Sequence, residues 1–212
     1  GGGQSIALSR AELAAAYNIY GEAVEFAASV WDEFFASGCA RADFEMSIDE
    51  TELPTTPAQH FFVAAELQRR GVRLATMAPR FCGEFQKGID YIGDKAQFER
   101  EIIAHAAIAR HFGYKLSIHS GSDKFSVFPL IGKYTQGRFH VKTAGTNWLE
   151  AMRIVAEHDP ALYRRAHAFA AQHVEEARKY YHVKLDMAQV PDPAGLKDHE
   201  LPGLLNMEDP RR

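Results

Sequence analysis

The feature that most constrains the fold of this chain is an alternation of strand-like and helix-like segments. An amphipathic helix is expected over residues 9–37. After it come expected strands at 42–48, 72–77, 114–119 and 139–143, each followed by a helical segment. Strands that alternate with helices in this way form a parallel sheet with helical crossovers. Two architectures fit the order: an open doubly wound sheet, and about four βα units of a (β/α)₈ barrel.

Capping residues mark the ends of the expected helices. Ser9 and Glu12 have the spacing of a capping box, and Thr56 before Pro57 predicts a second helix start. Gly38 and Gly113 predict the ends of the helices expected at 9–37 and 95–112, because glycine readily adopts the left-handed conformation that ends a helix. Further helices are expected at 128–134, 147–157 and 160–181.

Composition excludes several classes of protein. The 212 residues carry 24 Lys and Arg against 28 Asp and Glu, a net charge of −4, so no surface for nucleic acid is expected. No apolar run approaches the roughly 18 residues of a membrane span, and no signal-peptide pattern is present. Cys39 and Cys82 are too few for a disulfide scaffold and fit a reducing cytoplasm.

A change in composition near residue 190 sets the expected domain boundary. Residues 1–190 are predicted to form a partial βα-barrel domain. Residues 191–212 are predicted to be a proline-rich loop or linker, because they contain Pro191, Pro193, Pro202 and Pro210. The chain begins with Gly1 instead of Met, and we expect it to be the central piece of a longer protein.

In both architectures functional groups gather at the carboxyl ends of the strands. Every expected strand end in this chain carries ionisable or metal-ligating side chains. They are Asp49 and Glu50; Arg80, Glu84, Gln86 and Lys87; His119, Ser120, Ser122, Asp123 and Lys124; and His140, Lys142, Thr143 and Thr146. Four such loops at one rim indicate an active site.

Some of these positions allow more specific interpretations. His119 ends a strand, where an imidazole serves either as a metal ligand or as a cap bonded to a neighbouring loop. Asp49 and Glu50 are adjacent on an extended segment, so only one of them faces inward and can act in proton transfer. Lys142 shares a side with His140 and suits a substrate carboxylate, unless its ammonium group only reaches water.

The remaining motifs are weaker. The turn at 120–124 resembles an anion-binding loop, because its small residues let backbone N–H groups approach a ligand. The other histidines, including His60 and His105, are interpreted as surface or packing residues. No GxGxxG, GxSxG or CxxC motif supports a nucleotide cofactor, a serine triad or a redox pair.

Four segments, at residues 44–57, 74–93, 115–126 and 139–146, resemble a known family. The most specific block is Lys115-Leu116-Ser117-Ile118-His119-Ser120-Gly121-Ser122-Asp123-Lys124. In this order the segments resemble the tagaturonate/fructuronate epimerases, metal-dependent enzymes of hexuronate catabolism. The resemblance covers nearly the whole chain and implies an α/β fold that is part of a (β/α)₈ TIM-like barrel.

The resemblance also implies a site. Glu50 corresponds to an acid/base carboxylate, while Gln86 and His119 correspond to ligands of a divalent metal cation of unknown identity. The family carries the second acid/base and a further ligand in an upstream Asp-His pair, outside these residues. Charge and position add four substrate-binding candidates: Arg80, Asp123, Lys124 and Lys142.

The implied reaction interconverts D-tagaturonate and D-fructuronate, two ketohexuronates that we expect to differ at C3 beside the ketone. Glu50 would remove or return the C3 proton while a metal stabilises the enolate. Two alternatives stay open. One is another metal-dependent sugar or sugar-acid isomerase or an aldolase, the aldolase using Lys142 as a Schiff-base nucleophile. The other is a uronate-binding protein without catalytic activity.

Overall fold

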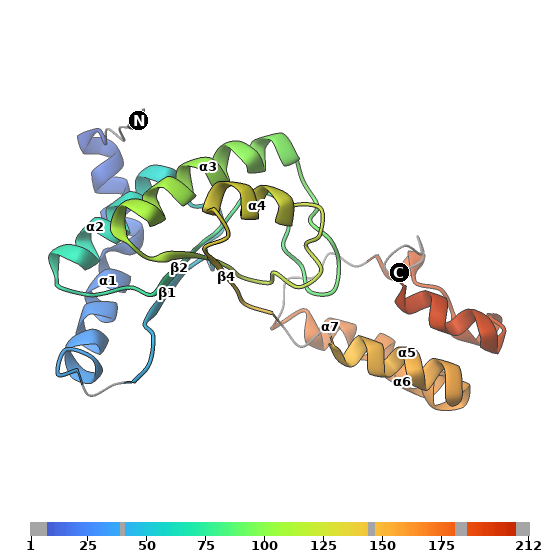
Figure 1. Cartoon of the computed structure of the whole chain (residues 1–212). Helices are drawn as coiled ribbons and strands as arrows, with labels where there is room; N and C mark the ends of the chain where they lie inside the picture. The colour runs from blue at the N-terminus through green and yellow to red at the C-terminus, as the bar shows by residue number, and fades with distance from the viewer. Residues whose placement is uncertain (1–7, 39–40, 144–146, 181–185, 207–212) are drawn as a thin grey trace. The chain divides into compact units, whose positions relative to one another are not determined.

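The computed structural model of the chain describes residues 8–38, 41–143, 147–180 and 186–206 (Figure 1). It divides into two compact units. The first comprises Gly1–Phe85 and Asp90–Lys142, and the second comprises Gln86–Ile89 and Thr143–Arg212. The main division thus falls near residue 142, while the domain boundary predicted at residue 190 stays a prediction.

The first unit confirms the expected alternation of strands and helices. Its elements are α1 (Arg10–Phe34), β1 (Glu45–Ile48), α2 (Pro57–Arg69), β2 (Thr76–Pro79), α3 (Lys95–Phe112), β3 (Lys115–Ile118), α4 (Phe128–Thr135) and β4 (Phe139–Val141). The four strands form one parallel sheet in the order β1-β2-β3-β4. The predicted sequential order, without a reversal among these strands, is therefore confirmed.

The predicted starts of α1 and α2 and the predicted end of α3 are also confirmed, whereas α1 ends at Phe34, three residues before the predicted end at residue 37. The Ser9 hydroxyl accepts a hydrogen bond from the Glu12 backbone, and the Glu12 carboxylate accepts one from the Ser9 backbone at 2.8 Å. Thr56 caps α2 with Pro57 in its first turn. Gly113 ends α3 at a φ of +86°, a conformation that costs glycine little because it has no Cβ.

The predicted position of the second strand is wrong by several residues, because β2 begins at Thr76 and not at Val72. The backbone N–H of Val72 donates to the Leu67 carbonyl at 3.0 Å, so the preceding residues close the last turn of α2. Val72 is buried as the strand-like pattern suggests, but it packs at the helix exit.

The two faces of the sheet differ in polarity. Met46, Met77, Leu116 and Ile118 are buried in one core cluster with side chains of α2, α3 and α4. Figure 1 shows these helices together on one side of the strands. The alternate residues of each strand point away from these helices, and they position the site described below.

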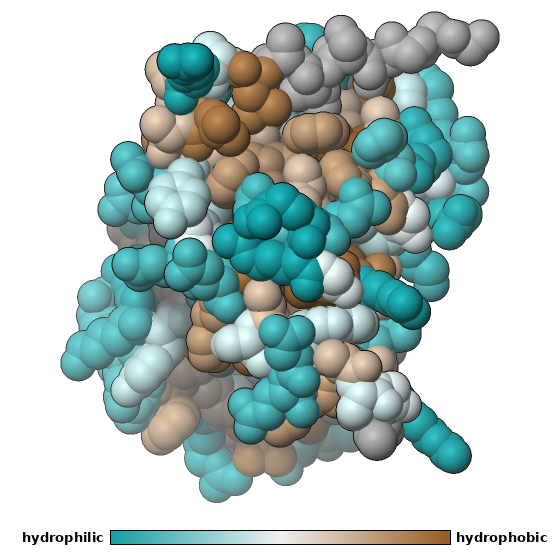
Figure 2. Space-filling view, turned by 90° about the vertical axis from the view of Figure 1, so that its left-hand side faces the viewer, coloured by the Kyte–Doolittle hydropathy of each residue, from teal (hydrophilic) through white to brown (hydrophobic). Residues whose placement is uncertain are grey.

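α1 packs on α2 and has large apolar side chains on its outer surface, namely Leu13, Tyr17, Ile19, Phe26 and Phe34. Figure 2 shows this side of the molecule, where hydrophobic side chains are interspersed with hydrophilic ones. No helix in the described part of the chain combines the length and apolar composition that crossing a membrane requires.

The second unit is helical. It contains α5 (Asn147–His158), α6 (Pro160–Gln172), α7 (Val174–Ala177) and the 3₁₀ helices Met187–Gln189, Pro193–Gly195 and Asp198–Leu205. The helix predicted at 160–181 is interrupted at His173, whose Nδ1 lies 2.8 Å from the Phe169 carbonyl in the last turn of α6.

The segment predicted as a proline-rich loop from residue 191 contains two of these 3₁₀ helices. The Arg164 guanidinium donates to the carbonyls of Pro193 and Leu196, at 3.1 and 2.8 Å, which fixes this segment against α6. Leu201 and Leu204 are buried with Ala156 and Tyr163 in a small core.

Candidate active site

One face of the sheet collects polar side chains from all four strands. Side chains two residues apart on a strand share a face, and parallel strands in register align their faces. Glu45 of β1 is paired with Thr76 of β2, and Ser117 of β3 is paired with His140 of β4. These residues therefore lie on the face opposite the helices.

His119, directly after β3, lies at the centre of this cluster. Its Nε2 is 2.8 Å from Oε1 of Glu45, and its Nδ1 is 3.0 Å from Oδ2 of Asp49. The side chain is only 9% exposed. Because each nitrogen faces a carboxylate oxygen, both can donate a hydrogen bond when the ring carries two protons.

These contacts shift the acidity of all three groups. Burial lowers the pKa of His119, but hydrogen bonds to Asp49 and Glu45 outweigh this and leave it above the ordinary value. Burial raises the pKa of Glu45, but hydrogen bonds from Thr76 and His119 outweigh this and leave it below the ordinary value. Burial likewise raises the pKa of Asp49, and hydrogen bonds from His119 and Ser47 leave it below the ordinary value. The hydrogen bonds thus favour the protonated form of His119 and the ionised forms of both carboxylates.

Glu45 is the functional candidate that the sequence analysis missed. Its second oxygen accepts a hydrogen bond from the Thr76 hydroxyl and lies 3.3 Å from Nδ1 of His140. His140 Nδ1 is also 2.8 Å from the Ser117 hydroxyl. The alternation of Glu45, Ser47 and Asp49 with buried Met46 and Ile48 is the signal that could have identified it.

Asp49 and Glu50 differ sharply in their surroundings. Asp49 faces His119 and accepts a hydrogen bond of 2.5 Å from the Ser47 hydroxyl. Glu50 is exposed and makes no hydrogen bond to the described residues. The structure therefore places Asp49 on the inner face, and the catalytic role assigned to Glu50 stays a prediction.

Arg80 follows β2 and is held by buried Thr55. The Thr55 hydroxyl accepts a hydrogen bond of 3.0 Å from the Arg80 backbone N–H, and the Thr55 N–H donates to the Arg80 carbonyl at 2.8 Å. These bonds join the loops after β1 and β2. The partly exposed Arg80 side chain forms no ion pair within the described residues.

The turn after β3 has a constrained backbone. Ser120 and Asp123 have φ values of +47° and +63°, which are uncommon for residues with a Cβ. A Cβ on Gly121 would lie 2.4 Å from a methyl group of Val141, so only glycine lets the turn approach β4 this closely.

The charged candidates near this turn have different environments. Lys124 is completely buried, and its ammonium group donates to the Ser122 carbonyl at 2.9 Å, so it stabilises the turn from within. Oδ2 of Asp123 is buried without a hydrogen-bond partner among the described residues. Lys142 is exposed, and its backbone pairs with Ile118 and Gly121.

The metal donors predicted from sequence fall in different units. His119 lies in the first unit and Gln86, which is buried, in the second, so their joint action on one metal stays a prediction. In the described parts of the chain no three His, Cys, Asp or Glu side chains form a group that could hold a metal ion. An imidazole beside a carboxylate fits a divalent cation in kind, but the described donors do not complete a coordination shell.

A second group of histidines lies in the core. Nδ1 of His60 and Nδ1 of His105 are 2.8 Å apart, and Nε2 of His60 is 2.6 Å from the Tyr114 hydroxyl. His60 and His105 are both fully buried, which confirms the packing interpretation and excludes the surface one. Burial lowers the pKa of His105 to about 4 and that of His60 well below its usual value.

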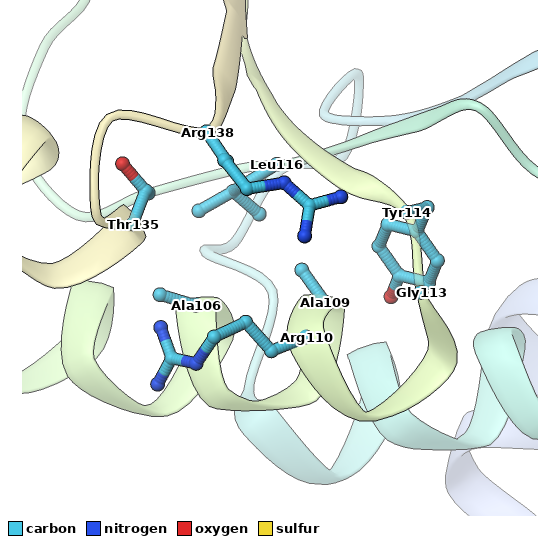
Figure 3. A pocket seen from close by; sticks show the side chains of 8 residues that line it. All are labelled: Ala106, Ala109, Arg110, Gly113, Tyr114, Leu116, Thr135 and Arg138. Carbon is cyan, nitrogen blue, oxygen red and sulfur yellow. The ribbon is translucent and has the colours of Figure 1, made fainter.

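A small hollow of about 30 Å³ lies at the other end of β3, lined by Ala106, Ala109, Arg110, Gly113, Tyr114, Leu116, Thr135 and Arg138. It has room for about one water molecule. Figure 3 shows the Arg110 and Arg138 side chains running in opposite directions, so their charges do not converge on a ligand. The hollow therefore offers no second candidate site beside the cluster around His119.

Known proteins resemble this chain over nearly its whole length. The sequence model of the family described as UxaE, tagaturonate epimerase, matches residues 2–212. A tagaturonate/fructuronate epimerase of Thermotoga maritima is 56% identical over 163 residues, which make up 76% of this chain and 34% of that protein.

Solved structures give the same picture. A glycerol-complexed crystal structure of the fructuronate-tagaturonate epimerase UxaE from Cohnella laeviribosi matches with a TM-score of 0.94 and 56% identity, over 99% of this chain and 43% of that one. The native crystal structure of that epimerase also gives 0.94, over 98% and 42%. The chain therefore spans about a third of the curated relative and about two-fifths of the solved chain.

Proposed function

Because this chain belongs to the tagaturonate epimerase family, we propose that it supplies part of a catalytic site that interconverts D-tagaturonate and D-fructuronate at C3. The observation that carries the proposal is the position of His119, at the carboxyl end of β3, between Asp49 at the carboxyl end of β1 and Glu45 at its start. Acid–base groups on such a rim are the usual arrangement of an α/β enzyme. The activity belongs to the complete protein. This chain spans about a third of the length of the curated relative and about two-fifths of the solved chain.

The architecture that we propose for this region is four consecutive βα units of a (β/α)₈ barrel. Sequential parallel strands with their helices on one side support it, since a barrel keeps its helices outside and its polar catalytic groups at the strand ends. The polar inner face formed by Glu45, Thr76, Ser117 and His140 would then point toward the barrel axis.

A ketohexuronate is the proposed substrate, and the cytoplasm is the proposed location. Arg80 and Lys142 follow β2 and β4 and have side chains that reach solvent, so they can bind the substrate carboxylate. Lys124 is buried and holds the turn after β3, so its proposed contribution is to shape the site beside Asp123.

His119 and Gln86 are the proposed ligands of a divalent cation. When bound, the cation would supply Lewis-acid stabilisation of negative charge on substrate oxygens. His119 already has a carboxylate on each nitrogen, so ligation requires one of these contacts to be exchanged. Asp49 is held, apart from His119, by Ser47 and a backbone N–H of its own segment, so it is the carboxylate more easily moved.

The position of the ketone limits the mechanism. With the carboxyl carbon counted as C1, the ketone is C5 and C4 separates it from C3, so the expected adjacency of C3 and the ketone is wrong. Loss of the proton on C3 would leave an electron pair that the ketone cannot accept. The favoured route is therefore reversible cleavage of the C3–C4 bond.

In this route a carboxylate at Glu50 or Asp49 removes the proton of the C3 hydroxyl group, and C3 becomes an aldehyde. The electron pair of the C3–C4 bond moves into C4–C5, and the ketone oxygen accepts the charge. Re-addition to the opposite face of the aldehyde inverts C3, and the proton is returned to its oxygen. Atoms and charge balance without an oxidant.

Conversion of tagaturonate by the complete protein in D₂O tests both parts of this proposal. Appearance of fructuronate in the NMR spectrum supports the epimerase, and its absence with intact, folded protein contradicts it. A product without deuterium at C3 supports cleavage of C3–C4, whereas deuterium at C3 returns the mechanism to removal of the carbon-bound proton. Borohydride trapping of Lys142 with substrate would support the aldolase alternative, and uronate binding without conversion would indicate a binding protein.

A further inference from the structure

Glu45 is the most firmly held carboxylate on the inner face of the sheet. It starts β1, and its carboxylate contacts side chains that come from or directly follow the other three strands: Thr76, His119 and His140. Asp49, in contrast, has besides His119 only partners from its own segment among the described residues, namely the Ser47 hydroxyl and a backbone N–H. The two carboxylates on His119 therefore differ in how far they can move.

The two contacts also lie at different levels of the sheet. Glu45 is the first residue of β1, whereas Asp49 follows its last residue. Nε2 of His119 thus points back into the sheet toward Glu45, and Nδ1 points to the rim toward Asp49. Chemistry in parallel sheets takes place at the rim, which is the Nδ1 side.

We infer that Glu45 is a positioning residue, which holds Nε2–H of His119 and thereby presents Nδ1 to a divalent cation at the rim. This inference rests on the proposed function, in which His119 is a metal ligand. A carboxylate on the distal nitrogen fixes the tautomer and ring orientation of a ligating histidine and makes the other nitrogen more basic. Glu45 acts through His119 and need not touch the substrate.

The surroundings of Glu45 suit this role. Its Oε1 is 2.8 Å from His119, while Thr76 and His140 contact the other oxygen, so the carboxylate cannot rotate without losing several contacts. Its pairing with Thr76 is set by the backbone register of β1 and β2. The orientation of His119 is therefore built into the sheet.

Binding of Co²⁺ alone to the complete, metal-free protein tests the inference, measured by competition with a chromophoric chelator. We expect Glu45→Ala to lower the Co²⁺ affinity by about 10–100-fold, the usual worth of such a partner. Glu45→Gln should lower it by a smaller factor, because the amide oxygen still accepts Nε2–H but has no charge. The matched control is Glu52→Gln, the same change at an exposed residue that does not contact the cluster within the described part of the chain.

The melting temperature of the metal-free variants separates positioning from a structural role. Glu45→Gln should melt near wild type, and it carries the test if Glu45→Ala does not fold. A lower melting temperature with Co²⁺ affinity within twofold of wild type overturns the inference, and so does complete loss of Co²⁺ with Glu45→Gln, which would make Glu45 a ligand. A wild-type protein that epimerises tagaturonate but binds no Co²⁺ overturns the inference and leaves the epimerase function standing.

Discussion

His119 and the pair formed by His60 and His105 belong to the same compact unit, yet their ring nitrogens face different partners. His119 has a carboxylate on each nitrogen, whereas His60 and His105 face each other and a tyrosine. The pKa of His119 lies above its ordinary value, and those of the buried pair lie below it.

Burial alone does not explain this difference. The His119 side chain is 9% exposed, hardly more than the fully buried His60 and His105. Burial lowers the pKa of all three rings, and only His119 has two carboxylates whose hydrogen bonds outweigh it. The first arrangement favours a charged ring at the rim, whereas the second pairs both nitrogens of His60 and leaves Nε2 of His105 without a hydrogen-bond partner among the described residues.

The largest expected effect comes from His119→Ala, which tests the proposed role of His119 in catalysis and metal binding. In the complete protein we expect epimerase activity to be lost and metal content to fall, with little change in thermal unfolding, because His119 lies at the edge of the core. Elemental analysis and calorimetry check the two parts. Unchanged metal content would make His119 a structural cap.

His105→Leu is the matched change in the buried group and should give the opposite pattern. It leaves Nδ1 of His60 without its partner, which costs about 1–3 kcal/mol of unfolding free energy. Metal content should stay at the wild-type level. If His105→Leu removed the metal as well, the two histidine groups would not be independent.

Glu50→Gln gives the next largest effect and sharpens the comparison at the rim. If Glu50 moves the proton of the C3 hydroxyl group, turnover should fall by about 10²–10⁴-fold, because glutamine keeps the size of the side chain but cannot carry the proton. Metal content should stay near wild type. Asp49→Asn is the companion variant, since Asp49 and not Glu50 contacts His119. Wild-type turnover in Glu50→Gln with loss in Asp49→Asn would transfer the role to Asp49.

The pattern of successes and failures has a physical cause. The strand order, the caps at Ser9 and Thr56, and the position of His119 depend on local periodicity and on a general rule about strand ends, so the sequence predicts them. Glu45 was missed because a single acid at a strand start has no distinctive pattern until Thr76 and His140 are placed beside it.

The buried pair was also beyond prediction. His60 and His105 lie 45 residues apart on α2 and α3, and their contact depends on the rotation of both helices about their axes. The short strand β2 was misplaced because buried Val72, at the exit of α2, has the same apolar character as a strand residue. Tertiary packing decides such cases.

Acid should destabilise the protein through the buried pair. The folded-state pKa of His105 is about 4, against about 6.5 when unfolded, so the unfolded chain binds protons first. The contribution of the uncharged His105 ring to the unfolding free energy is therefore fully present above about pH 6.5. It is lost as the pH falls toward about 4, and the loss amounts to about 3 kcal/mol. Urea unfolding of wild type and His105→Leu between these pH values checks this. Parallel pH curves for the two proteins would contradict it.

The smallest expected effect is that of Tyr114→Phe, which tests how the protons are arranged in the buried group. If the Tyr114 hydroxyl donates to Nε2 of His60, then Nδ1–H of His60 donates to Nδ1 of His105, and the remaining proton of His105 lies on Nε2. In this order Nε2 of His105 is an unpaired donor among the described residues, and in the reverse order it is an unpaired acceptor. Removing the hydroxyl leaves Nε2 of His60 unpaired, at a cost of about 1 kcal/mol, and should leave the rim and its metal content unchanged.

Chemical denaturation measures this loss of stability, and its pH dependence shows which group donates. Without the hydroxyl donor, His60 accepts a proton more readily in the folded state, so stability should fall less steeply as the pH is lowered. A steeper acid loss in Tyr114→Phe would mean that His60 donates to Tyr114, and the proton order in the core would be reversed.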